Sequence, residues 1–283
     1  MPLVARTVPV AFAGVLFLTA CGTQTASQGV GGPGTATASC PPYSQQSEDV
    51  KITGCTTART VTFQVTNPEA KTATYTVTFA FRTAAGAENV TRTVEAVGPG
   101  RTVKGTVEAP ELASVVSGVE VGKVRSVPVD EASSASGPCP ASGVHVYADE
   151  GDAAMGLRVV GLHLVNCGTR PYRLDGYPEL QLLDEDHESV DGVRLLRGTE
   201  QISTALGGEG SPTPVVLQPG EAAQTTIAWR NTTEAGVGDP VNAPYVRVRP
   251  KTGAAPVTVV PELDLGTTGK LGVGPWKAAE TSR

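Results

Sequence analysis

Two stretches of strict alternation between apolar and other residues constrain the fold of this chain most. Residues 61–66 read VTFQVT and residues 75–81 read YTVTFAF, so every second side chain is large and apolar. A period of two residues with β-branched and aromatic side chains is typical of half-buried antiparallel strands. The alternation recurs at residues 157–164, where its phase changes and a β-bulge near Val160–Gly161 would absorb the change. The sequence therefore predicts an all-β protein.

Breaks in composition divide the chain into domains. Gly and Pro supply 33 and 22 of the 283 residues, which suits many short strands joined by turns. The residues between 22 and 39 and between 130 and 138 are small and polar, and such segments act as linkers. We expect six segments: a signal peptide at 1–20, a flexible tether at 21–39, a small β-sandwich at 40–129, a linker at 130–138, a second β-sandwich at 139–276 and a tail at 277–283.

A pattern in the first half of the chain returns in the second. Residues 61–67 (VTFQVTN) and 160–166 (VGLHLVN) both read as a strand that ends in Asn. Later, residues 97–100 (VGPG) and 217–220 (LQPG) both place a Pro-Gly turn before an alternating stretch. Two tandem immunoglobulin-like antiparallel β-sandwiches would explain this repeat. Chance similarity between two all-β domains is the alternative, because Pro-Gly turns are common.

The first twenty residues have the pattern of an export signal. Arg6 precedes an apolar stretch at residues 10–18, which is too short to span a bilayer. Residues 18–21 read Leu-Thr-Ala-Cys, which resembles the lipobox where bacterial lipoproteins receive a diacylglyceryl group on the cysteine. An ordinary signal peptide that happens to end before Cys21 is the alternative. We expect a protein anchored by lipid on Cys21 to the extracytoplasmic face of the cell membrane.

The cysteine count agrees with a lipid on Cys21. The chain has five cysteines, an odd number for an exported protein. If Cys21 carries lipid, four cysteines remain and three pairings are possible. Each predicted sandwich holds two of the four, so Cys40–Cys55 with Cys139–Cys167 is the simplest pairing.

The second half resembles a known family. The pattern is carried by CP at 139–140, NCG at 166–168, LDGYP at 174–178, LQPG at 217–220 and IAW at 227–229. This order is similar to that of the domain of unknown function 4232, which occurs in actinobacterial secreted proteins and lipoproteins. The resemblance covers about residues 139–276, and its most specific part is the Gly-Tyr-Pro segment. It implies an immunoglobulin-like fold, a surface location and one disulfide, and it implies no reaction.

Signals of catalysis or of bound cofactors are weak. The net charge of −6 argues against a nucleic-acid partner, and neither a GxSxG elbow nor a phosphate-binding glycine loop is present. His187-Glu188 begins like the zinc motif HExxH, but residue 191 is Asp. The other two histidines, His145 and His163, lie far apart in the sequence. We therefore expect no catalytic residue, no cofactor and no metal ligand.

Two weaker candidate sites remain open. Acidic residues crowd positions 149–152 and 184–191, where they are either turn residues or calcium ligands. Tyr172, Tyr177 and Trp276 form either a binding surface or part of the core. The function that we expect is a non-catalytic binding or interaction module, with an envelope protein or a glycan as partner. The alternatives are an enzyme with an unrecognised active site and a purely structural envelope protein.

Overall fold

The computed structural model describes residues 40–44, 47–111, 115–206 and 210–279, and Ala38–Arg283 is one compact unit. The described part contains 21 strands and two 3-10 helices, Val129–Glu131 and Thr204–Leu206. The predicted all-β fold is confirmed. The predictions of a signal peptide, a tether and a lipid on Cys21 concern residues that lie outside the described ones.

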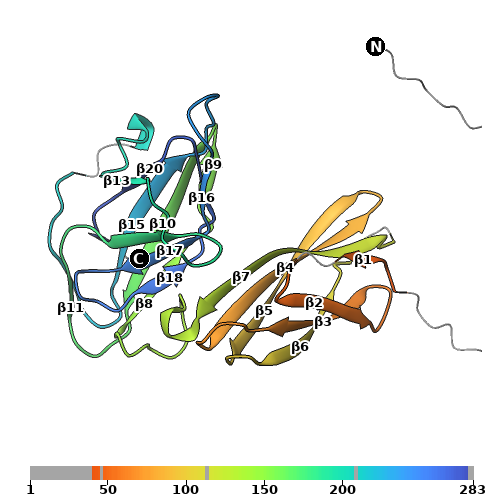
Figure 1. Ribbon diagram of the computed structural model, residues 1–283. Helices are drawn as coiled ribbons and strands as arrows, with labels where there is room; N and C mark the ends of the chain where they lie inside the picture. Colours follow the sequence, from red (N-terminus) through yellow and green to blue (C-terminus); the bar gives the residue numbers. More distant parts are fainter. Residues whose placement is uncertain (1–39, 45–46, 112–114, 207–209, 280–283) are drawn as a thin grey trace, which may run out of the picture. The chain divides into compact units, whose positions relative to one another are not determined.

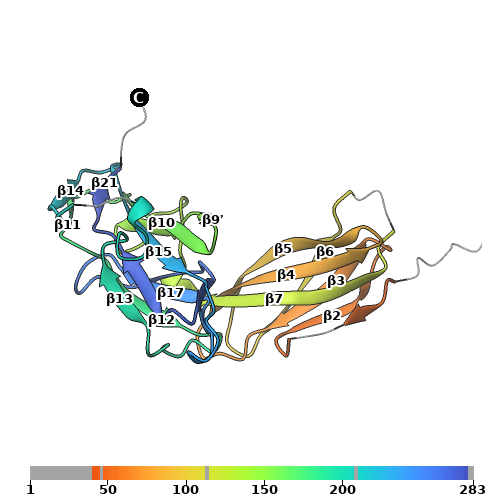
Figure 2. The ribbon, with the colours of Figure 1, turned by 90° about the horizontal axis from the view of Figure 1, so that it is seen from above.

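The first sandwich consists of two sheets that share one core (Figures 1 and 2). One sheet has the order β1-β7-β4-β5 and the other has the order β2-β3-β6. In chain order the strands are β1 (Tyr43–Ser44), β2 (Val50–Cys55), β3 (Thr60–Thr66), β4 (Ala73–Thr83), β5 (Gly86–Val97), β6 (Thr102–Glu108) and β7 (Gly118–Pro128). The apolar phase of β3 and β4 is buried, and the rings of Phe63 and Phe79 lie 4.8 Å apart.

The second sandwich has a separate core, which includes the buried side chains of Leu162, Ile227 and Trp276. Its main sheet has the order β13-β20-β15-β10-β8, with β21 on β15 and β9 on β10. Smaller ladders pair β11 with β14, β12 with β17, β17 with β18, and β16 with β19. In chain order the strands are β8 (Val144–Ala148), β9 (Asp152–Ala154), β10 (Leu157–Asn166), β11 (Tyr172–Leu174), β12 (Glu179–Leu183), β13 (Arg194–Arg197), β14 (Val215–Leu217), β15 (Ala222–Arg230), β16 (Val241–Ala243), β17 (Tyr245–Arg249), β18 (Val257–Val259), β19 (Leu263–Gly266), β20 (Lys270–Val273) and β21 (Lys277–Ala278).

The predicted bulge at Val160–Gly161 is wrong. The register of β10 with β15 runs without a break from Leu157 to Val165. The irregularity lies on the other side of β10, between β8 and β9. There the three residues 149–151 lie opposite only two residues of β10. The buried phase of β10 begins at Val160, and Val159 lies on the partly exposed face. The apparent change of phase therefore reflects apolar residues outside the core.

Asn67, which directly follows β3, is fully buried and holds the chain around it by side-chain hydrogen bonds. Its Nδ2 donates to the carbonyl of Lys71 at 2.8 Å and to the carbonyl of Val97 at 2.7 Å. Its Oδ1 accepts from the backbone N–H of Glu69 at 2.9 Å. The backbone carbonyl of Asn67 accepts from Gly100 of the Pro-Gly turn at 2.8 Å. One side chain thus joins the end of β3 to the end of β5.

Asn166 makes the same bonds at the end of β10. Its Nδ2 donates to the carbonyls of Arg170 and Leu217, both at 2.9 Å, and its Oδ1 accepts from Gly168 N at 3.1 Å. Its carbonyl accepts from Gly220 N at 2.7 Å. In both sandwiches the partners are the residues two and four positions after the asparagine, the residue two positions before the proline of the Pro-Gly turn, and the glycine of that turn. The repeat in the sequence therefore corresponds to one hydrogen-bond arrangement that is built twice.

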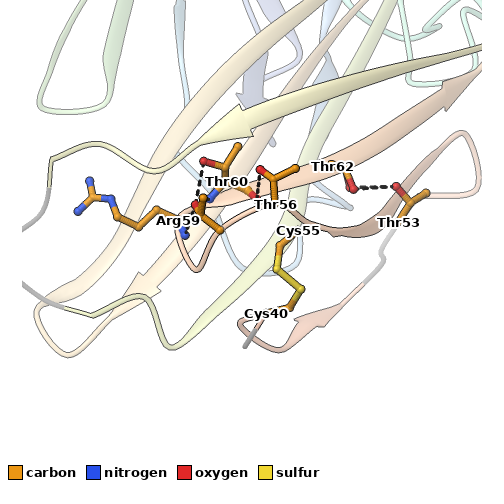
Figure 3. Close-up of a disulfide and its surroundings, with 8 residues drawn as sticks. Cys40, Thr53, Cys55, Thr56, Arg59, Thr60 and Thr62 are labelled. Carbon is orange, nitrogen blue, oxygen red and sulfur yellow. Dashed lines mark hydrogen bonds between the residues drawn. A yellow bond between two sulfur atoms is a disulfide. The ribbon is translucent and has the colours of Figure 1, made fainter. Parts of the chain in front are cut away.

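Two disulfides close loops inside the two sandwiches. Cys40 is bonded to Cys55 at the end of β2, beside the hydroxyl pair that Thr53 and Thr62 form at 3.1 Å (Figure 3). Cys139 is bonded to Cys167, and the Cα atoms of each pair lie 5.6 Å apart. These are the pairs that the simplest division of the cysteines predicted. Loops of this length stabilise a domain by about 3 kcal/mol, mainly because the unfolded chain is restricted.

Polar groups join the end of β7 to the second sandwich. Arg125 donates to both carboxylate oxygens of Glu262, at 2.7 and 2.9 Å, and lies over the ring of Tyr245. Ser126 N donates to the Tyr245 hydroxyl at 3.0 Å, and Ser126 O lies 2.8 Å from Nε2 of His187. His187 and Glu262 have φ values of 61° and 55°, which cost energy in residues other than glycine. Hydrogen bonds rather than a shared apolar core therefore form this junction.

We expect the junction to weaken as the pH falls. Burial disfavours the charged form of Glu262, but the hydrogen bonds and charges of Arg125 and Lys123 outweigh it, so the pKa lies below the ordinary value of 4.5. A group with a lowered pKa stabilises the folded state above its unfolded pKa, and this stability is lost as the pH falls through the folded value. Calorimetry should show the two sandwiches unfolding together at neutral pH and separately in acid.

Glu262→Gln provides the matched variant for this prediction. It keeps the shape of the side chain but removes the charge, so its two transitions should already be separated at neutral pH. If its calorimetric trace equals that of the natural chain at neutral pH, the Arg125–Glu262 pair does not couple the sandwiches.

Candidate functional site

A groove of about 630 Å³ opens on the second sandwich between the β11–β12 turn and β13. The turn contributes residues 175–178, and the start of β12 contributes Glu179 and Leu180. β13 contributes residues 195–197, and Val273 of β20 and Pro212 complete the apolar part of the lining. The groove therefore combines aliphatic and aromatic side chains with a small number of charged groups.

The buried Trp276 holds the β11–β12 turn in place. Its backbone N–H donates to the carbonyl of Gly176 at 2.9 Å, and its indole Nε1 donates to the carbonyl of Pro250 at 2.9 Å. Gly176 has a φ of 76°, a conformation that favours glycine, and Pro178 is buried. The Gly-Tyr-Pro segment is thus a braced turn that presents Tyr177 to the groove.

Charged groups of both signs surround Tyr177. The guanidinium of Arg197 lies 5.5 Å from the centre of the Tyr177 ring, a cation–π contact. The carboxylate of Glu179 accepts a hydrogen bond from the hydroxyl of Thr252, and Asp175 is exposed. The side chain of Leu195 is 44% exposed although it is aliphatic. The groove can therefore hold an apolar group and meet polar groups of either charge.

The three aromatic residues that were candidates for a binding surface are separate in the structure. Trp276 is 1% exposed and belongs to the core, as the alternative interpretation predicted. Tyr172 packs against the core, burial raises its pKa, and Lys251 Nζ lies 3.9 Å from the centre of its ring. Of the three residues, Tyr177 lines the groove.

A second hollow, of about 510 Å³, lies beside the acidic turn at residues 149–152. Asp149 Oδ1 accepts from the backbone N–H groups of Gly151 and Gly161, at 3.0 and 2.8 Å. Its Oδ2 lies 3.1 Å from Nε2 of His163, whose ring stacks on Tyr147. A Cβ on Gly161 would approach this carboxylate to 2.3 Å, so the contact requires glycine. The Asp149 carboxylate therefore holds the turn at residues 149–152 against β10.

The acidic loop at residues 184–191 is also organised by its own backbone. Asp184 Oδ1 accepts from the N–H groups of Asp186 and Glu188, at 3.0 and 2.9 Å, as in an Asx turn. Across the described residues, no group of three or more His, Cys, Asp or Glu side chains is arranged to hold a metal ion. The described ranges likewise contain no helix long and apolar enough to cross a membrane.

The histidines do not gather at one site. His145 is buried, and its Nδ1 lies 2.7 Å from the Ser134 hydroxyl. His163 contacts Asp149, and His187 lies at the junction with Ser126. Each histidine thus has its own polar partner in the fold.

Sequence reasoning missed β13 as part of the groove. Its residues, RLLR at 194–197, show neither the alternation of a half-buried strand nor a recognisable motif. The signal in the sequence that could have indicated this strand is the pair of adjacent leucines between two arginines.

The fold defines an all-β protein with two sandwiches, and comparison with known proteins adds one family match. Residues 139–277 match the family model described as Domain of unknown function (DUF4232). No curated protein matches the chain. Among solved structures, the crystal structure of red sea bream transglutaminase is similar with 9% identity and a TM-score of 0.17. The match covers 84% of this chain but 32% of that one, and a likeness this weak carries no argument about function.

Proposed function

We propose that this chain is a lipid-anchored protein of the cell envelope that binds a partner through the groove beside Tyr177, without catalysing a reaction. In this proposal both sandwiches are immunoglobulin-like modules, and the partner is an envelope protein or a glycan. The observation that carries the proposal is the groove itself. It joins the ring of Tyr177, on a turn that Trp276 braces, to the exposed aliphatic side chain of Leu195 and to charged groups.

General features of binding sites support this use of the groove. Ligand sites are concave and mostly apolar, with a few polar groups that set orientation, and Tyr and Arg often dominate the binding energy. Tyr177 and Arg197 bring both residue types into contact at one place. Val273 and Leu180 of the lining also contact the core, whereas the aliphatic side chain of Leu195 stays exposed in the groove.

The proposed anchor rests on the sequence at residues 18–21. Leu-Thr-Ala-Cys follows a short apolar stretch, and the residues after it are small and polar. Two or more acyl chains on the N-terminal cysteine would give stable membrane binding, whereas one chain is marginal. Residues 22–39 would then separate the sandwiches from the membrane surface.

We expect Tyr177→Ala to reduce partner capture at least about tenfold, because a central aromatic residue commonly contributes most of the binding energy. Crosslinking in intact cells followed by affinity purification measures the captured partner. Arg197→Ala should have a similar effect. Tyr43→Ala is the control, since Tyr43 is an exposed tyrosine of the first sandwich. Equal capture by Tyr177→Ala and the natural chain would refute the groove as the binding site.

We expect Cys21→Ala to release the protein from the membrane or to stop its processing. Detergent phase partitioning and mass spectrometry of the N-terminal peptide measure this. The natural chain should enter the detergent phase with lipid on Cys21. An unmodified, soluble natural protein that begins elsewhere would contradict the proposed anchor and would leave the groove experiment valid.

A further inference from the structure

The strand β5 forms a long free edge of the first sandwich. It is 12 residues long, most of its side chains are exposed, and it contains no proline. It pairs with β4 along one side, and within the described part of the chain no strand pairs with its other side. A free edge of this length presents backbone groups that can bind another strand.

The β4–β5 turn determines which backbone groups face outward. The strands are joined by a two-residue turn between Thr83 and Gly86, and the register is regular from there to the pair Tyr75–Val94. In such a hairpin the closing pair is hydrogen-bonded, and bonded and non-bonded pairs then alternate. The backbone groups that face the free side are therefore those of Ala87, Asn89, Thr91 and Thr93. In agreement, the guanidinium of Arg92 reaches the carbonyl of Thr91, at 3.1 Å.

The charges of β5 are arranged so that the strand complements itself. Its regular segment, residues 86–94, is centred on Val90. If a second β5 pairs with it antiparallel about Val90, Glu88 lies opposite Arg92 of the second copy, and the same pair occurs again by symmetry. The outward-facing Asn89 lies opposite the outward-facing Thr91, so these residues can exchange backbone hydrogen bonds.

Other registers lack this complementarity. A pairing centred on Glu88 or on Arg92 places two like charges directly opposite each other, which is destabilising. A pairing centred on Asn89 or on Thr91 places Glu88 opposite a valine. Val90 and Val94 pack partly against the core, so in the pairing about Val90 an apolar pair closes the seam on the inner face.

We propose that β5 binds β5 of a second copy of this chain, antiparallel and centred on Val90. The two four-stranded sheets then become one eight-stranded sheet with a two-fold axis at Val90. Arg92 exchanges its contact with the Thr91 carbonyl for Glu88 of the second copy. Such an isologous interface is the commonest form of homodimer. This inference does not depend on the groove or on the lipid anchor.

Charge exchange tests the interface in the full chain. Sedimentation velocity should show a dimer for the natural chain, and Arg92→Glu or Glu88→Arg should each weaken it about tenfold or more, because two attractive pairs become repulsive. The double variant Glu88→Arg/Arg92→Glu should restore the dimer. Glu95→Arg is the control, since residue 95 lies outside the regular segment. Circular dichroism must show that every variant is folded.

Cysteine crosslinking tests the register. Directly opposed residues in a non-bonded pair have Cα atoms about 4.5 Å apart, which permits a disulfide. In a Cys21→Ala background, Val90→Cys should therefore form a disulfide between copies. Thr91→Cys should not, because its two copies would lie diagonally, about 7–8 Å apart. A monomeric natural chain, a dimer indifferent to the charge changes, or stronger crosslinking at residue 91 would each overturn the proposal.

Discussion

Asn166→Ala should lower the free energy of unfolding of the second sandwich by about 3 kcal/mol or more. The substitution removes the donor that the carbonyls of Arg170 and Leu217 share, whereas the N–H of Gly168 keeps its bond to the Gly143 carbonyl at 2.9 Å. A buried polar group without a partner costs about 1–3 kcal/mol, and the lost side chain also leaves a cavity. The bond to the Leu217 carbonyl is buried, so bulk water does not replace it. The cost should therefore exceed that of an ordinary surface substitution.

Tryptophan fluorescence measures this effect in the intact chain. Both tryptophans, Trp229 and Trp276, are buried in the second sandwich, so the fluorescence change in denaturant reports on that sandwich. Asn242→Ala is the matched control, because Asn242 is exposed on the same sandwich. A loss of less than about 1 kcal/mol for Asn166→Ala would show that the repeated hydrogen-bond arrangement contributes little.

The repeat makes a second comparison possible. Asn67→Ala should destabilise the first sandwich, where Tyr75 also donates to Asn67 Oδ1 at 3.0 Å. In the Glu262→Gln background, where the sandwiches are expected to unfold separately, far-ultraviolet circular dichroism should detect this loss, while the tryptophan transition should change little. The two asparagines, which have the same backbone partners in their two sandwiches, thus act as a control for each other.

The parts of the fold that could be predicted from the sequence are those with a local periodic signal. Alternation at residues 61–66 and 75–81 predicts β3 and β4, because one face of each strand packs into the core. The two strand-ending asparagines could be found because each precedes a matching Pro-Gly turn. The disulfide pairing could be predicted because each pair of cysteines lies within one sandwich.

The parts that could not be predicted depend on contacts between distant segments. Arg125 and Glu262 lie 137 positions apart, and nothing local in the sequence pairs them. The groove depends on β13, whose four residues have no periodicity and which lies beside Tyr177 only through the sheet order. The prediction of a bulge at Val160–Gly161 was wrong because Val159 is apolar but does not belong to the core. Apolar residues on a partly exposed face mislead any argument from alternation.

A fragment of residues 129–283 should fold by itself into the second sandwich. The buried core of this sandwich consists of residues between Val144 and Trp276, and no residue of the first core belongs to it. A domain of this size can bury enough apolar surface to be stable alone. The fragment should be a soluble β-protein, and its tryptophan transition should resemble that of the full chain with Glu262→Gln, in which the sandwiches are expected to unfold separately. An unfolded or insoluble fragment would show that the sandwiches depend on one another.

The shorter fragment 139–283 should also fold, but with a lower free energy of unfolding. The segment 130–138 was predicted as a linker, and in the structure it is bonded to the second sandwich. The carboxylate of Glu131 accepts from Nε of Arg247 at 2.7 Å and from the Thr258 hydroxyl at 3.0 Å, and its side chain is 11% exposed. Hydrogen bonds to charged groups contribute about 1.5–3 kcal/mol each, so the two fragments should differ by at least about 2 kcal/mol. Glu131→Gln in the longer fragment should keep part of this extra stability and lose the rest, since Gln keeps the acceptor oxygen without the charge. Equal stability of the two fragments would show that this segment connects the sandwiches without stabilising either.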